Sequence, residues 1–246
     1  MIKFALYLTK ILLVLGTALL ATSCEFNFKT LAPTGAIERT TQQINAPFEN
    51  IKVSQGIQVV LNQTGSTAVA VETFPNYLEH IKIEVVNETL VIKKKGNIYF
   101  RSNKPVMVYV NNAQFKELTA NSGARILSKT SIKSDNLHLD TSSGASITLE
   151  VVTRKLFADT SSGSTITISG KAIDTEADAS SGSNIDLKKL TAVNAVANSS
   201  SGAEIHVNPQ TKLEAEASSG SRIYYFSALS QIAIDESSGG KVKYQE

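Results

Sequence analysis

The chain has 246 residues, of which 24 are basic and 22 acidic, so its net charge is +2 when the three histidines are neutral. Neither sign of charge forms a long run, which argues against a nucleic-acid partner. A single cysteine excludes an internal disulfide bond, so stability has to come from packing and hydrogen bonds.

The N-terminus has the pattern of a secretory signal. An apolar run over residues 11–21 follows two lysines and is too short to span a bilayer, but it suits the core of a signal peptide. Residues 20–24 (LATSC) resemble a bacterial lipobox, although Ala21 stands where leucine is expected. We therefore predict a signal peptide over residues 1–23 and a lipid attached to Cys24 that tethers the protein to a membrane. The alternative is an ordinary secretory signal with an incidental cysteine.

The next two segments differ in their pattern. Residues 24–47 are polar without a strong period, and we predict a flexible tether there. Residues 48–118 are strand-rich but irregular, with a degenerate copy of the later repeat around Gly56 and a tight turn at Asn87-Glu88. The strands predicted in this part are Ala68–Glu72, Ile81–Val86, Thr89–Lys93 and Val106–Val110.

From residue 119 onward, a Ser-Gly motif recurs at spacings of 18 to 21 residues, in most copies as Ser-Ser-Gly. Self-similarity at such a period is typical of stacked repeats. We assign the glycines to structural turns, because glycine adopts positive φ at no steric cost. They are Gly123, Gly144, Gly163, Gly182, Gly202, Gly220 and Gly239.

The apolar positions around each glycine lie at odd offsets, which predicts a strand with one buried face on both sides of the corner. A second turn then takes up the variation in length. Strand pairs this short cannot bury their faces alone, so the copies are expected to stack about 4.8 Å apart as parallel coils. We predict an all-β fold, a single-stranded β-solenoid with about 19–20 residues per coil. It forms one domain over residues 48–246, irregular over 48–118 and regular over 119–246.

Two details of this solenoid follow from the same pattern. The serine directly before each glycine has an odd offset, so it is predicted to point inward and to form a ladder of hydroxyl groups. At the far end, Lys241, Lys243 and Glu246 flank the last strand, where charges are expected to discourage edge-to-edge pairing.

The sequence offers no catalytic constellation. None of the three histidines has metal-ligand spacing to another His or Cys; His138 and His206 have even offsets and are expected to be solvated on the surface. No serine lies in a Gly-x-Ser-x-Gly elbow, and no phosphate-binding glycine loop is present. We predict no catalytic residue and no cofactor.

One column of carboxylates is the exception that needs weighing. Four residues before successive glycines, an acidic residue recurs at an even offset and should face outward, interrupted once by Asn198. Carboxylate oxygens suit Ca²⁺, so a cation-binding stripe is one hypothesis. The competing interpretation, which we favour, is that the carboxylates are solvated and screened. The residues concerned are Asp140, Asp159, Asp178, Glu216 and Asp235.

The chain as a whole resembles the bacterial "putative auto-transporter adhesin, head GIN domain" family over residues 48–246. The resemblance rests on the Ser-Gly repeats and on four earlier segments, which are Phe48–Val53, Gly56–Leu61, Asn87–Ile92 and Pro105–Val110. It implies a right-handed β-helix related in shape to pectin lyases, with Ser/Gly motifs at its tight turns. It also implies an anchored or secreted protein of Bacteroidetes-type bacteria with a role in cell adhesion.

Three functions remain open at this point. The first is a non-enzymatic lipoprotein of the cell envelope, anchored through Cys24 at the outer membrane, that binds a glycan or a protein as an adhesin or scaffold. The second is a β-helix carbohydrate-active enzyme, which would require a cluster of carboxylates in one groove. The third is a purely structural periplasmic protein without a ligand.

Overall fold

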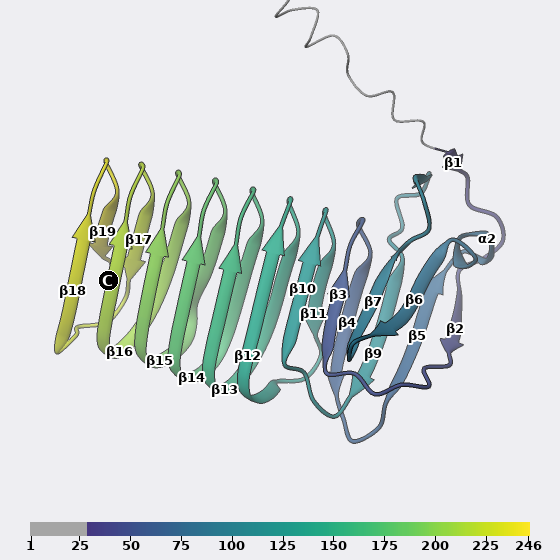
Figure 1. Ribbon diagram of the computed structural model, residues 1–246, viewed down its shortest axis with the longest axis horizontal. Coiled ribbons are helices and arrows are strands. Elements are labelled where there is room, and N and C mark those ends of the chain that lie inside the picture. The colour runs from purple at the N-terminus through teal and green to yellow at the C-terminus, as the bar shows by residue number, and fades with distance from the viewer. Residues whose placement is uncertain (1–28) are drawn as a thin grey trace, which may run out of the picture.

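The computed structural model describes residues 29–246, which form a flattened β-solenoid closed at one end by an irregular cap (Figure 1). The predicted signal peptide and Cys24 lie outside the described residues. None of the helices among residues 29–246 is long and apolar enough to cross a membrane. The all-β solenoid predicted from the repeats is confirmed.

The regular coils stack side by side through parallel pairing alone. Strands β13 to β16 run unbroken through the predicted second turn, where the chain only bends and the register shifts in β14–β15 and β15–β16. The length variation between repeats is absorbed there. The strands are β10 (Glu117–Asn121), β11 (Arg125–Ser128), β12 (Ile132–Ser142), β13 (Ser146–Thr160), β14 (Thr165–Ala179), β15 (Asn184–Ser199), β16 (Glu204–Ala217), β17 (Arg222–Tyr225), β18 (Gln231–Glu236) and β19 (Lys241–Tyr244).

The interior of the coils is thin because two columns of different size face each other. Three residues after each corner glycine, isoleucines lie in register from coil to coil and are fully buried from Ile126 to Ile223. Five residues before the glycine, the facing column contains mostly alanine, such as Ala158, Ala177 and Ala197, also buried. Stacking thus buries one continuous core, as expected for repeats that cannot fold alone.

The corners explain why Ser-Gly recurs. Both residues have positive φ, for example 54° at Ser162 and 68° at Gly163, as in a type I′ turn. The corner glycines from Gly123 to Gly220 donate their N–H groups to the serine carbonyl of the next coil, as Gly163 does to Ser181 at 3.2 Å. This ladder begins at Gly56, which follows Gln55 with the same backbone conformation, so the degenerate coil predicted around Gly56 is confirmed.

The predicted inward ladder of serines is wrong in its position. The serines before the glycines are exposed, because two successive residues of positive φ break the alternation on which the prediction relied. The buried hydroxyls lie elsewhere in the corner. Ser164 and Ser183, directly after the glycines, bond to the carbonyls of Ser161 and Ser180 at 2.6 and 2.7 Å, and Thr160 lies 2.6 Å from Ser164.

The cap at the N-terminal end places chain segments out of sequence order. Strands β3 (Asn50–Val53) and β4 (Gln58–Gln63) form a coil inserted between the β10–β11 coil and the pair β7 (Thr89–Lys94) and β9 (Met107–Asn112). Strand β5 (Ala68–Thr73) pairs antiparallel with β9, and strand β6 (Ile81–Val86) pairs antiparallel with β7. The strands predicted in this part are confirmed to within one or two residues, and Asn87 and Glu88 have the positive φ of a tight turn.

Aromatic side chains fill the cap, beside the short helix α2 (Pro75–Leu78). Tyr77 is buried and stacks on Phe100, with ring centroids 4.1 Å apart, while Phe74 meets its edge. The Tyr77 hydroxyl donates to the Leu31 carbonyl at 3.1 Å. This bond ties strand β1 (Lys29–Leu31), which pairs with β8 (Ile98–Phe100), to the cap.

Part of the predicted tether belongs to the folded structure. In addition to β1, residues 38–42 form β2 (Glu38–Gln42), which pairs antiparallel with β5. The residues of β2 are all polar, which suits an edge strand whose outer face is in water, so the low hydropathy that suggested a flexible segment is compatible with a strand here.

Candidate functional site

The outward face of the sheet that contains β12 and β18 brings the predicted acidic residues into one column. Six positions lie directly opposite one another in successive strands, and the strand register pairs each with the next. They are Asp140, Asp159, Asp178, Asn198, Glu216 and Asp235. Neighbouring strands lie about 4.8 Å apart, so the column places carboxylates one strand spacing apart in every coil except that of the neutral Asn198.

This column forms one wall of a groove of about 520 Å³ that follows the corner of the solenoid. Two residues further along each coil, a second outward column consists of serines, which line the same groove. They are Ser161, Ser180, Ser200, Ser218 and Ser237. The groove therefore repeats a carboxylate and a hydroxyl, or their nearest equivalents, once per coil.

The carboxylates in the groove repel one another. The pKa of Asp159 is raised, first by partial burial and then by the negative charges of Asp178, Asp140 and Glu176. The nearby His138 lowers this pKa slightly. Asn198 reduces the electrostatic repulsion where it interrupts the column, because its Nδ2 donates a hydrogen bond to Asp178 Oδ1 at 2.8 Å. The interruption that looked like an imperfection of the repeat is thus a neutral donor between two acids.

The cation hypothesis for this column stays a prediction. Within residues 29–246, no three His, Cys, Asp or Glu side chains converge on a point where they would hold a metal ion. A line of carboxylates on parallel strands points in one direction instead of surrounding an ion, as the six to eight oxygen ligands of Ca²⁺ require. Thermal unfolding tests it: Ca²⁺ is expected to raise the melting temperature no more than Mg²⁺ or NaCl of equal ionic strength does.

The same face becomes mixed in charge further from the corner. A smaller hollow of about 290 Å³ lies among Lys155, Asp174, Glu176, Val196 and Lys212 with their neighbours. Lys155 approaches Glu176 at 3.9 Å. Exposed pairs of this kind contribute little to stability. The hollow is lined by two lysines and three acidic residues, whereas the groove is lined by five acidic residues and no basic one.

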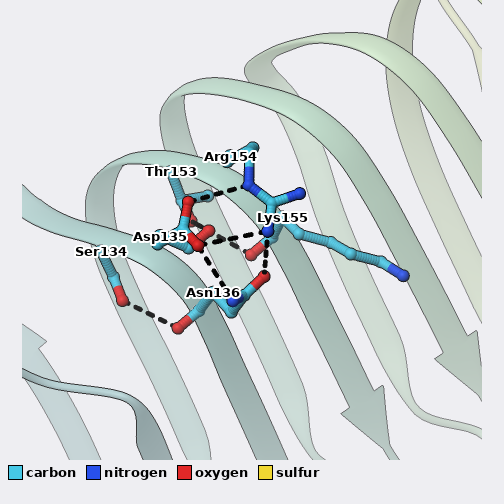
Figure 2. Close-up of polar contacts among 6 residues, drawn as sticks. All are labelled: Ser134, Asp135, Asn136, Thr153, Arg154 and Lys155. Carbon is cyan, nitrogen blue, oxygen red and sulfur yellow. Dashed lines mark hydrogen bonds and ion pairs between the residues drawn. The ribbon is translucent and has the colours of Figure 1, made fainter.

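At the bend opposite the corners, consecutive coils are joined by an ion pair that sequence reasoning missed (Figure 2). Arg154 Nε lies 2.8 Å from Asp135 Oδ1 and Nη2 3.2 Å from Oδ2, and Nη2 also donates to Asn136. The Arg154 guanidinium holds the pKa of Asp135 below its usual range. The 19-residue separation of the two residues, one repeat period, was the signal that would have identified the pair.

The two histidines at even offsets differ from each other. His138 is exposed and stacks on Phe157 of the next coil, with ring centroids 4.1 Å apart. His206 was expected to be solvated, but only 13% of its side chain is exposed, because Tyr224 and Phe226 pack edge-on against it. Its Nε2 lies 2.8 Å from Glu204 Oε1. The His206 prediction was wrong because aromatic side chains of the following coil cover it.

Comparison with known proteins identifies one family. A family model described as "Putative auto-transporter adhesin, head GIN domain" matches residues 47–228. No curated protein matches the chain.

Solved structures share the fold at low sequence identity. A "putative adhesin" from Bacteroides fragilis has a TM-score of 0.80 at 15% identity, with 87% of this chain and all of that chain covered. A "putative adhesin" from Parabacteroides merdae has 0.72 at 17% identity, with 88% and 99% covered. A "putative lipid binding protein" from Parabacteroides distasonis has 0.75 at 16% identity, with 89% and 100% covered. At these identities the likeness shows a shared fold.

Proposed function

The chain belongs to the family described as "Putative auto-transporter adhesin, head GIN domain", and from this premise we propose that it is a non-enzymatic, lipid-anchored adhesin of the cell envelope. Cys24 carries the lipid and holds the protein at the outer membrane. The folded coils present the groove of carboxylates and serines to a partner outside the cell. A glycan is the partner class that this groove suits best.

The observation that carries this proposal is the coil-by-coil repetition of the groove. Asp140, Asp159 and Asp178 offer acceptors at one strand spacing, and the serines beside them offer donors and acceptors. Sugar hydroxyl groups are both donors and acceptors of hydrogen bonds. A polysaccharide that lies along the groove would meet the same carboxylate and serine hydroxyl again in each following coil. An open groove can bind such a polymer through many weak contacts, which together give a much higher affinity than any one contact alone.

The location is tested first, by protease treatment of intact cells that express the full chain. Release of fragments from the folded part is expected, together with incorporation of a palmitate analogue that Cys24→Ser abolishes. Protection that is lost only when the outer membrane is opened would contradict the surface location and favour a structural periplasmic protein.

Binding is tested with the same cells on immobilised polysaccharides and mucin. The triple variant Asp140→Ala, Asp159→Ala, Asp178→Ala is expected to lower adhesion at least about tenfold, because three of the repeated contacts are lost together. Its matched control replaces Thr148 and Thr167, which face outward from the opposite sheet, by alanine. Equal adhesion of the two variants would contradict the groove as the binding site.

One observation favours the second candidate, a carbohydrate-active enzyme. Asp159 has a raised pKa and lies one strand away from both Asp140 and Asp178, and a retaining glycosidase needs two carboxyl groups about 5 Å apart. The groove carboxylates stand side by side on one wall, however, instead of flanking a bound sugar. Release of reducing ends from a polysaccharide panel that Asp159→Asn abolishes would establish this candidate in place of the first.

A further inference from the structure

The last coil, formed by β18 and β19, exposes residues that the repeat assigns to the core. Ile232 and Ile234 lie in register with the buried Leu213 and Ala215, yet 45% and 47% of their surface is exposed. Tyr244 lies in register with the partly buried Tyr225 and is 49% exposed. In the described part of the chain, β18 pairs only with β16 and β19 only with β17.

The open edge also presents backbone donors. Lys241 and Gln245 donate their N–H groups to the preceding coil, so the alternation of a strand turns those of Val242 and Tyr244 to the open side. Glu236 Oε1 accepts the Val242 N–H at 2.7 Å, and its Oε2 lies 3.0 Å from Lys241 Nζ. Terminal repeats normally carry a polar outer face. In this coil, the Glu236 carboxylate is the side chain that accepts a backbone N–H of the open strand β19.

We propose that this end of the solenoid docks against the same end of a second copy, with β18 of each chain antiparallel to β19 of the other. The two-fold axis of such a dimer runs along the strand direction, and both sheets continue across the interface. The apolar residues of each last coil then meet those of the other, as in the coils behind them.

Charge favours this arrangement over the alternative two-fold dimer, in which β18 pairs with β18 and β19 with β19 of the second copy. Of the residues of β19, Lys241 and Lys243 share the outward face, so pairing β19 with β19 places lysine opposite lysine in every register that keeps the faces aligned. Pairing β18 with β19 instead places Asp235 opposite Lys241, Ile234 opposite Val242 and Ile232 opposite Tyr244. The lysines predicted to block edge pairing therefore exclude one geometry and favour another. Glu236 has to release Val242 in the dimer, so the dimer is expected to dissociate on dilution.

Charge reversal tests the geometry in the full chain, purified in mild detergent and measured by light scattering over a range of concentrations. Wild type is expected to reach the dimer mass. Asp235→Lys or Lys241→Asp is expected to weaken the dimer by about tenfold, because each reversal acts twice in a two-fold interface. The double variant Asp235→Lys, Lys241→Asp restores the pair and is expected to associate like wild type. Asp140→Lys, in the same acidic column five coils away, is the control and leaves the dimer unchanged.

Cysteine cross-linking tests the register independently of the purified state. A mixture of Asp235→Cys and Lys241→Cys chains in membranes is expected to form a disulfide-linked pair, while neither variant alone does. A wild type that stays monomeric at every concentration would overturn the proposal. So would reversal variants that associate as tightly as wild type, or self-linked Asp235→Cys chains, which would indicate the other two-fold.

Discussion

The cap and the repeated coils bury apolar surface in different ways. The cap adds the antiparallel strands β5 and β6, and its Tyr77 packs on Phe74 and Phe100 in contacts that do not recur from coil to coil. In the coils, every pairing is parallel, and each coil repeats the small contribution of an isoleucine facing an alanine. The cap therefore depends on single residues, whereas the stability of the coils is a sum over neighbouring interfaces.

The largest expected effect is at the centre of the cap. Tyr77→Ala should lower the free energy of unfolding by about 3–5 kcal/mol, because it empties a site enclosed by aromatic rings. Tyr77→Phe keeps the ring and removes only the hydrogen bond to Leu31, at a cost of about 1 kcal/mol. Urea unfolding measures both. A loss for Ile185→Val in the coils as large as that for Tyr77→Ala would contradict the comparison, since trimming one methylene costs about 1 kcal/mol.

A glycine within a strand, away from the corners, should matter more than the repeated corner glycines. Gly170 has a φ of 113°, and a Cβ there would lie 2.0 Å from the Val151 carbonyl oxygen, so Gly170→Ala should cost about 3 kcal/mol. At Gly163 a Cβ meets nothing within 4 Å, so Gly163→Ala incurs only the strain of positive φ, about 1 kcal/mol. Melting of the two variants side by side decides this, and the reverse order would refute it.

The column of acids should respond to the loss of its one neutral donor. Asn198→Asp replaces the hydrogen bond to Asp178 with repulsion from Asp178 and Glu216, at a cost of about 1 kcal/mol at pH 7. Asn198→Ala loses the hydrogen bond alone and should cost less. An aspartate variant as stable as the alanine variant at low salt would show that the column is fully screened.

The smallest effect is a gain. Asp159→Asn removes repulsion from both neighbours and should add about 0.5 kcal/mol at pH 7. Because folding raises the pKa of Asp159, the folded chain binds a proton at this carboxyl group more tightly than the unfolded chain does. The stability that this proton contributes to the wild type is therefore greatest below pH 3.8 and is lost as the pH rises through the raised pKa. The advantage of the variant should therefore shrink on acidification. An advantage that grows instead would contradict the assigned cause.

The candidate site could be predicted from the sequence as far as local periodicity extends. Even offsets placed Asp140, Asp159 and Asp178 outward, and the constant period aligned them in one column, because parallel coils of equal length keep their register. The burial of His206 was not predictable in this way. It depends on Tyr224, which lies opposite His206 in the register of β16 and β17, and also on Phe226, which lies beyond the end of β17.

The same division holds for the fold. Strand, corner and coil follow from residues close together in the chain, since alternation and turn chemistry act over a few residues. Contacts between distant segments set the rest: β3 and β4 lie between coils that come later in the chain, and β1 and β2 are held by the cap. Even the corner serines turn outward because two successive residues adopt positive φ, which lets the glycines from Gly123 to Gly220 donate to the neighbouring coil. Local patterns carry no information about such partners, because the hydrogen bonds and buried surface that hold them form only when the coils stack.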